Sequence, residues 1–131
     1  MTLTLQAALQ YASRNWKVFP LLPNSKLPAT PHGCKDATTD SQTIQKLFAK
    51  PCNLGIATGN GLVVIDLDVK PDRDGIESWH GLCVRQEAIQ GTFECLTPSG
   101  GRHLYFHVPT GILAPNSASK LGQGIDVRGE G

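Results

Sequence analysis

The stretch LVVIDLDV, residues 62–69, decides the fold of this chain. Its six aliphatic residues predict a buried strand, yet it also contains Asp66 and Asp68, and a carboxylate is costly to bury unpaired. Side chains on a strand alternate between the two faces of a sheet. We therefore expect Val64, Asp66 and Asp68 on one face and the intervening aliphatic residues on the other.

The spacing of Asp66 and Asp68 suits divalent cations. Two residues on a strand span roughly 6.5–7 Å, and carboxylates that lean together from that spacing can share ions of the kind found in two-metal phosphoryl-transfer sites. On a helix the same spacing would direct the two groups to nearly opposite sides. An alternative stays open at this point: the strand leaves the core at Asp66, and both aspartates are solvated residues ahead of the turn KPDRDG (70–75).

The pattern of the whole chain predicts an α+β domain with a mostly antiparallel sheet and flanking helices. Helices are expected from Thr2 or Thr4 to about Arg14, over 38–50 with entry at Asp40 or Ser41, and over 75–90. Strands are expected at 17–22, 53–59, 62–69, 92–98, 103–108 and 124–129. The glycine turn GNG (59–61) predicts that 53–59 and 62–69 form a hairpin. Residues 21–40 and 109–123 are expected to be loops.

Composition narrows the class of protein. A length of 131 residues fits one domain, and a net charge of +1 gives no global basic field, so nucleic acid would have to bind a local patch. The four cysteines form no C-x-x-C pair, which excludes zinc-ribbon spacing and favours reduced thiols. With no signal peptide and no apolar run near ~20 residues, we expect a soluble, cytoplasmic protein without a membrane anchor.

The segment TPSGGRHLYF, residues 97–106, contains a second candidate site. Its serine–glycine–glycine turn can bring backbone amides close to an anion, and His103, on the strand that follows, can donate to a phosphate oxygen. The alternative is an ordinary hairpin turn with a half-exposed histidine. A zinc site through His103 and His107 is disfavoured, because four residues on a strand separate them by about 13 Å.

The last predicted strand, GIDVRG (124–129), places Asp126 and Arg128 on one face. They are either a surface ion pair, which is worth little, or a third metal ligand beside an arginine that contacts phosphate or template. Because the chain stops just after this strand, at GEG (129–131), we expect a fragment truncated at its C-terminal end.

The segments VVIDLDV, TPSGGRHLYF and GIDVRG, in this order, resemble the three motifs of the archaeo-eukaryotic primase superfamily. More closely, the chain resembles the bifunctional primase/polymerase (Prim-Pol) N-terminal domain of plasmid, phage and prophage replication proteins. The likeness extends upstream through VFPLLPNSKLPAT (18–30), KDATTD (35–40) and NLGIATGNGLVVIDLD (53–68), and covers about residues 5–131.

The resemblance implies an RNA-recognition-motif-like sheet around a nucleotidyltransferase site. That site would make primers or DNA from NTP or dNTP on a single-stranded DNA template, with a helicase domain possible further along the full-length chain. It implies that Asp66, Asp68 and Asp126 bind two Mg²⁺ or Mn²⁺ ions and that His103 contacts the phosphates of the nucleotide. The nucleotide-binding set that it implies is Ser99, Gly100, Arg102, His103, Lys26 and Arg128.

Two other functions stay open from the sequence. Clustered carboxylates also serve metal-dependent nucleases and phosphohydrolases. A non-catalytic module that binds nucleotide or DNA for a downstream helicase would show the same motifs. The sequence does not distinguish primase from polymerase activity, or ribo- from deoxynucleotide use.

Overall fold

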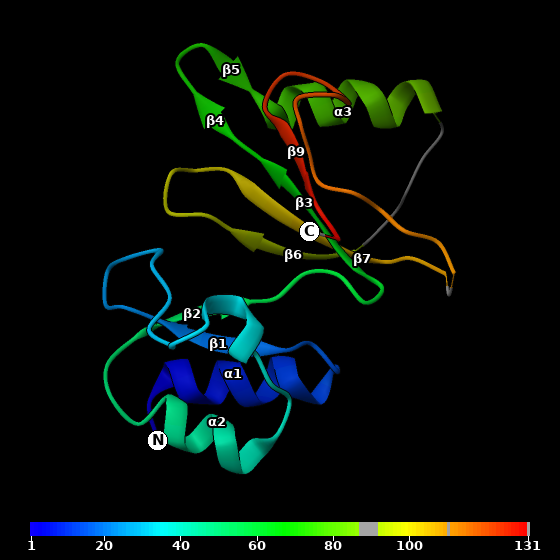
Figure 1. Cartoon of the computed structure of the whole chain (residues 1–131). Helices are drawn as coiled ribbons and strands as arrows, with labels where there is room; N and C mark the ends of the chain where they lie inside the picture. Colours follow the sequence, from blue (N-terminus) through cyan, green and yellow to red (C-terminus); the bar gives the residue numbers. More distant parts are fainter. Residues whose placement is uncertain (87–91, 110, 131) are drawn as a thin grey trace. The chain divides into compact units, whose positions relative to one another are not determined.

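The computed structural model describes residues 1–86, 92–109 and 111–130, and the chain divides into two compact units, Met1–Ala57 and Thr58–Gly131. Figure 1 shows the helices and strands of the two units, and each unit has its own hydrophobic core. The α-helices and the antiparallel strand pairs in the described part of the chain confirm the predicted α+β class.

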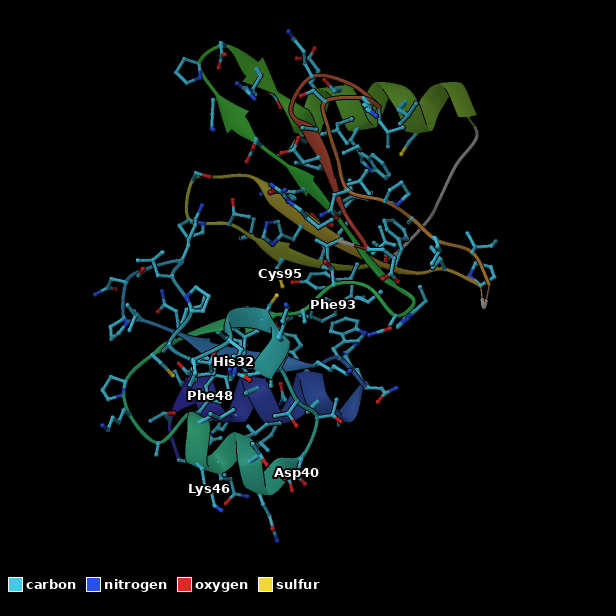
Figure 2. The ribbon with its side chains drawn as sticks, viewed as in Figure 1. His32, Asp40, Lys46, Phe48, Phe93 and Cys95 are labelled. Carbon is cyan, nitrogen blue, oxygen red and sulfur yellow. The ribbon has the colours of Figure 1, made fainter. Side chains whose placement is uncertain are left out.

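The first unit packs two helices against a two-stranded sheet. Its elements are α1 (Leu3–Ser13), β1 (Val18–Leu21), the 3₁₀ turn η1 (Gly33–Asp36), α2 (Ser41–Leu47) and β2 (Asn53–Ile56). The core consists of Ala8, Val18, Ile44 and Phe48, each at most 1% exposed. Phe48, at the end of α2, is labelled in Figure 2. Ile44 and Phe48 are four residues apart, so they lie on one side of this helical segment.

Helix α2 begins at a side-chain cap. Asp40 Oδ2 accepts hydrogen bonds from the backbone N–H of Thr43 at 2.9 Å and from its hydroxyl at 2.6 Å, which confirms the predicted entry at Asp40. These bonds favour the ionised carboxylate, so the pKa of Asp40 lies below its usual 3.8, chiefly because of the Thr43 hydroxyl and then its amide.

We expect Asp40→Ala to lower the thermal midpoint by a few degrees, since an alanine at this position leaves the Thr43 amide uncapped. Asp40→Asn keeps a capping oxygen and should lose less. The pKa is depressed on folding, so the contribution of the charge is present above the unfolded value and is lost as pH falls through the lowered value. The gap in melting temperature between wild type and Asp40→Asn should therefore be smaller at pH 3 than at pH 7. A gap of the same size at both pH values would contradict this assignment.

The predicted hairpin between 53–59 and 62–69 is wrong. The glycine turn does form, with Gly59 N donating to Leu62 O at 2.8 Å, but β2 pairs with β1 in the first unit. The physical reason is tertiary packing: Leu54 and Ile56 of β2 pack against the core of the first unit. The burial of these two side chains therefore outweighs the local preference of the glycine turn for a hairpin.

The second unit is built on a five-stranded antiparallel sheet in the order β6–β7–β3–β9–β8. The strands are β6 (Phe93–Leu96), β7 (Arg102–His107), β3 (Leu62–Leu67), β9 (Ile125–Arg128) and β8 (Ser117–Ala118). The predicted strands 92–98 and 103–108 form as β6 and β7, which pair with each other. Two expectations need correction: β8 lies within the predicted loop, and the predicted turn at 70–75 contains a small hairpin of β4 (Val69–Lys70) and β5 (Arg73–Asp74).

One face of this sheet is covered by α3 (Gly75–Gln86), and the last predicted residues of that helix, 87–90, lie outside the described part of the chain. The buried residues of this core are Val63, Ile65, Leu67, Leu104 and Ile125. Ile76 and Trp79 of α3 pack against them. The aliphatic residues that alternate with Asp66 thus form the core, as their periodicity predicts.

All four cysteines are free thiols, and burial raises the pKa of the Cys52 thiol. Among the described residues, no helix combines the length and the apolar character needed to cross a membrane.

Candidate active site

The register of the five-stranded sheet brings together three polar residues from separate strands. Asp66 of β3 lies opposite His103 of β7 on one side and opposite Asp126 of β9 on the other. Residues directly opposite in an antiparallel pair point to the same face of the sheet. Since the neighbours of Asp66 on β3 are in the core beneath α3, these three side chains occupy the other face. Cys95 and Ala118 continue the row on the two edge strands.

Asp68 joins this group from just beyond the end of β3. The strand ends at Leu67, one residue before Asp68, so this aspartate does not lie within the strand as predicted. One carboxylate oxygen each from Asp66, Asp68 and Asp126 nevertheless lies within 4.8 Å of the others. We call these three residues the acidic triad. All three are partly buried, so the charges are close together in a setting where water screens them only partially.

Polar neighbours orient two members of the acidic triad. His103 Nε2 lies 3.4 Å from Asp66 Oδ1. The backbone N–H of Ser119 donates to Asp126 Oδ1 at 3.2 Å, and the Arg128 guanidinium lies 3.4 Å from Asp126 Oδ2. The side chains of Asp66 and Asp126 are 16% and 17% exposed. Three carboxylates against one guanidinium leave a net charge of −2 when His103 is neutral, an excess that a cation would offset.

Ser119 is a site residue that the sequence did not indicate. It has a φ of +54°, unusual for a serine, and this turn directs its amide to Asp126. The segment 109–123 is predicted to be a loop, and nothing in its composition marks this position.

In the glycine turn between β6 and β7, the amides of Gly100 and Gly101 form hydrogen bonds within the turn itself. Gly100 N donates to Thr97 O at 3.0 Å and Gly101 N donates to Thr97 Oγ1 at 2.9 Å. Gly100 has a φ of +90°, which explains the glycine. The amides expected to approach an anion are thus already occupied, and a phosphate contact at this turn rests on Ser99, whose hydroxyl lies 3.3 Å from Thr97 Oγ1.

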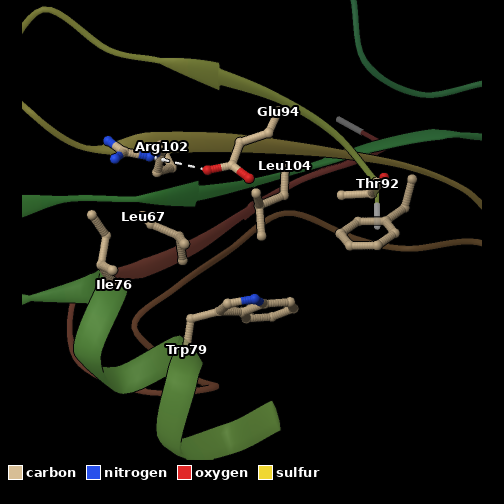
Figure 3. Close-up of a pocket in the computed structure, with 8 residues that line it drawn as sticks. Leu67, Ile76, Trp79, Thr92, Glu94, Arg102 and Leu104 are labelled. Atoms are coloured by element: carbon tan, nitrogen blue, oxygen red, sulfur yellow. Dashed lines mark ion pairs between the residues drawn. The ribbon is translucent and has the colours of Figure 1, made fainter. Parts of the chain in front are cut away.

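Arg102 does not meet the acidic triad. It lies opposite Leu67 in the β3–β7 register and so shares the helix-covered face, where its Nε lies 3.0 Å from a Glu94 carboxylate oxygen. Figure 3 shows this ion pair beside a cleft of about 380 Å³ that Trp79 and Leu104 help to line. The Arg102 guanidinium also donates through Nη1 to Gly101 O at 3.1 Å, so a phosphate contact would have to use its remaining N–H groups.

Lys26 belongs to the first unit, in the loop that follows β1. Its predicted role in nucleotide binding stays a prediction. Arg128 does lie beside the triad, through its contact with Asp126.

An antiparallel sheet that gathers three carboxylates and a histidine on one face defines a protein with a candidate divalent-cation centre for phosphate chemistry. The family model for the N-terminal domain of bifunctional DNA primase/polymerases, Prim-Pol, matches residues 8–131, and the chain belongs to this family. Membership supports a primase or polymerase function in general, with DNA and nucleotide as the molecules bound. Comparison with curated proteins found no match.

Proposed function

We propose that this domain is a nucleotidyltransferase that joins NTP or dNTP on a single-stranded DNA template, in a replication protein of the plasmid, phage or prophage type. The observation that carries the proposal is the acidic triad, built from two distant segments of a chain that belongs to the Prim-Pol family. In this proposal the triad and His103 form the active site.

The donor set of the triad fits Mg²⁺ or Mn²⁺. Its ligands are all carboxylate oxygens, which these hard cations prefer, and Mg²⁺ completes its shell with water and substrate phosphates. Donors on opposite sides of one Mg²⁺ lie about 4 Å apart, given bonds of about 2.0–2.1 Å. The triad oxygens all lie within 4.8 Å of one another, an upper bound slightly larger than that spacing. Two ions bound at these residues would supply activation of the attacking hydroxyl and neutralisation of the pyrophosphate.

The remaining roles follow from the positions of the side chains. Asp66, Asp68 and Asp126 hold the negative charge that recruits the cations. His103, 39% exposed and beside Asp66, is placed to donate a hydrogen bond to a triphosphate oxygen. Phosphoryl transfer needs little covalent help from the protein, so positioning and charge account for the contribution of these residues.

We expect His103→Ala to raise the KM for nucleotide by about 10-fold, because a hydrogen bond to a charged group is worth roughly 1.5 kcal/mol or more. The value of kcat should change less, since the triad remains in place. His103→Gln retains a donor and should recover part of the affinity. Steady-state kinetics on a primed template measures both effects, and an unchanged KM in His103→Ala would remove His103 from the nucleotide site.

The proposal is tested by primer synthesis and primer extension on single-stranded DNA with Mg²⁺ or Mn²⁺. Incorporation of labelled nucleotide into a growing strand supports it. Release of fragments from labelled DNA would instead identify a metal-dependent nuclease. Nucleotide or DNA binding without turnover would identify a non-catalytic module of a helicase-linked protein. The same assay run with NTP and with dNTP, and with and without a primer, separates primase from polymerase activity.

A further inference from the structure

Three segments of the second unit meet at the end of β3. Asp68 N donates to Gly124 O at 2.8 Å, and Gly75 N donates to Asp68 O at 2.7 Å. Gly75 is the first residue of α3, and Gly124 immediately precedes β9. In Figure 1 the start of α3 and the loop into β9 lie at the same end of the sheet as the end of β3. We call this arrangement of Gly75, Asp68 and Gly124 the backbone clasp.

The clasp admits no side chain at either glycine. A Cβ at Gly75 would lie 2.3 Å from Gly124 O, and a Cβ at Gly124 would lie 2.7 Å from Gly75 N. Both distances are below the 3.0 Å that real Cβ contacts respect. Gly124 also has a φ of +78°, which favours glycine independently. Gly101 approaches from the neighbouring turn, where a Cβ would lie 2.2 Å from Leu67 O.

The backbone clasp connects Asp68 to the start of β9, a connection that the paired residues of β3 and β9 do not provide. The ladder between β3 and β9 holds Asp66 opposite Asp126 and ends at Leu67 opposite Ile125. Asp68 lies beyond that ladder, so its bond to Gly124 is what ties it to the strand that contains Asp126. From this geometry we propose that Gly75 and Gly124 are positioning residues, which set the distance from the Asp68 carboxylate to Asp66 and Asp126. The proposal rests on the cation-binding role of the triad in the proposed function.

Cation binding is expected to be highly sensitive to a side chain at Gly75. A methyl group at Gly75 must open its contact with Gly124 O by at least 0.7 Å, the difference between 2.3 Å and 3.0 Å. Mg²⁺ demands near-ideal octahedral geometry, and altering groups that orient metal ligands typically costs 10–100-fold in affinity. Because Gly75 and Gly124 are both hydrogen-bonded to the backbone of Asp68, a displacement of this size between them should weaken cation binding even where the fold survives.

The test compares Gly75→Ala with Gly129→Ala. At Gly129 a Cβ would lie 1.9 Å from Ala114 O, so this control has at least as severe a clash, in the same unit, away from the clasp. We expect Mn²⁺ titration followed by electron paramagnetic resonance to show at least about 10-fold weaker binding in Gly75→Ala and wild-type affinity in Gly129→Ala, at a temperature where circular dichroism shows both folded. Wild-type affinity in Gly75→Ala, or an equal loss in Gly129→Ala, overturns the proposal.

A second measurement needs no variant. If the clasp positions Asp68 for the cation, then by linkage bound cation stabilises the clasp. Saturating Mg²⁺ should slow hydrogen exchange at the Asp68 and Gly75 amides more than at Val108, whose amide bonds to Gly61 O at 2.9 Å elsewhere in the unit. Equal slowing at the three amides contradicts the proposal. If wild type binds neither Mn²⁺ nor Mg²⁺, the triad itself fails as a cation centre. If wild type binds and Gly75→Ala binds equally, only the positioning role fails.

Discussion

Replacing Asp68 by asparagine is expected to lower nucleotide incorporation by more than about 100-fold while leaving the fold intact. Changing residues that merely orient metal ligands costs 10–100-fold, and the loss of a direct ligand should exceed that. Asp68 bonds to Gly75 and Gly124 through its backbone, which the substitution does not alter. Asparagine has almost the same shape as aspartate, so any loss of activity reports the removal of the negative charge and not a change in packing.

The same substitution should raise or preserve stability when no divalent cation is present. Three carboxylates within 4.8 Å repel one another, and removing one charge relieves part of that repulsion. Added Mg²⁺ should then raise the melting temperature of wild type, which binds it, and have little effect on Asp68→Asn. Differential scanning fluorimetry with EDTA and with Mg²⁺ measures both effects.

Asp72→Asn is the matched control for these measurements. Asp72 lies in the turn between β4 and β5, 73% exposed, with its carboxylate 3.5 Å from the Arg73 guanidinium. An exposed pair of this kind contributes little, so this variant should retain both incorporation and the Mg²⁺ response. Incorporation retained by Asp68→Asn, or lost by Asp72→Asn, would show that the triad is not the site of nucleotidyl transfer.

Much of the triad could be predicted because strand periodicity is a local property. The alternation around Asp66 indicated which face it occupies, and the alternation in GIDVRG did the same for Asp126. What the residues alone could not supply is the register, since Asp66 opposite Asp126 depends on how two distant strands pair. The resemblance to a known family implied that the three aspartates act together, and the structure shows the strand register that places Asp66 opposite Asp126.

The predictions that failed or found no support concern which strand or which hydrogen-bonding group a segment contacts, and local sequence periodicity does not determine this. The GNG turn favoured a hairpin, but the partner of β2 was chosen by the core of the first unit, which local sequence does not reveal. Arg102 is adjacent to His103 and therefore points to the opposite face, a consequence of alternation that grouping by motif overlooked. The amides of Gly100 and Gly101 are satisfied within their own turn, which only coordinates could show.

Ile125→Ala should destabilise the second unit by about 3 kcal/mol, within the 2–5 kcal/mol typical of deleting a large aliphatic side chain from a core. Ile125 is 0% exposed and lies opposite Leu67, whereas its neighbour Asp126 points to the other face of β9. Val127→Ala, on the same face but only partly buried, should cost less. Urea denaturation in a Trp16→Phe background, where Trp79 fluorescence reports on this core, measures both losses.

The position of Ile125 also separates stability from cation binding. The isoleucine packs beneath the sheet and Asp126 stands above it, so Ile125→Ala should reduce stability while its Mn²⁺ affinity stays near that of wild type at a temperature where the variant is folded. Asp126→Asn should show the opposite pattern, with Mn²⁺ affinity lost and the cation-free urea midpoint nearly unchanged. If both variants lost affinity and stability together, β9 would not hold its core side chain and its site side chain on independent faces, and the triad would depend on the packing beneath it.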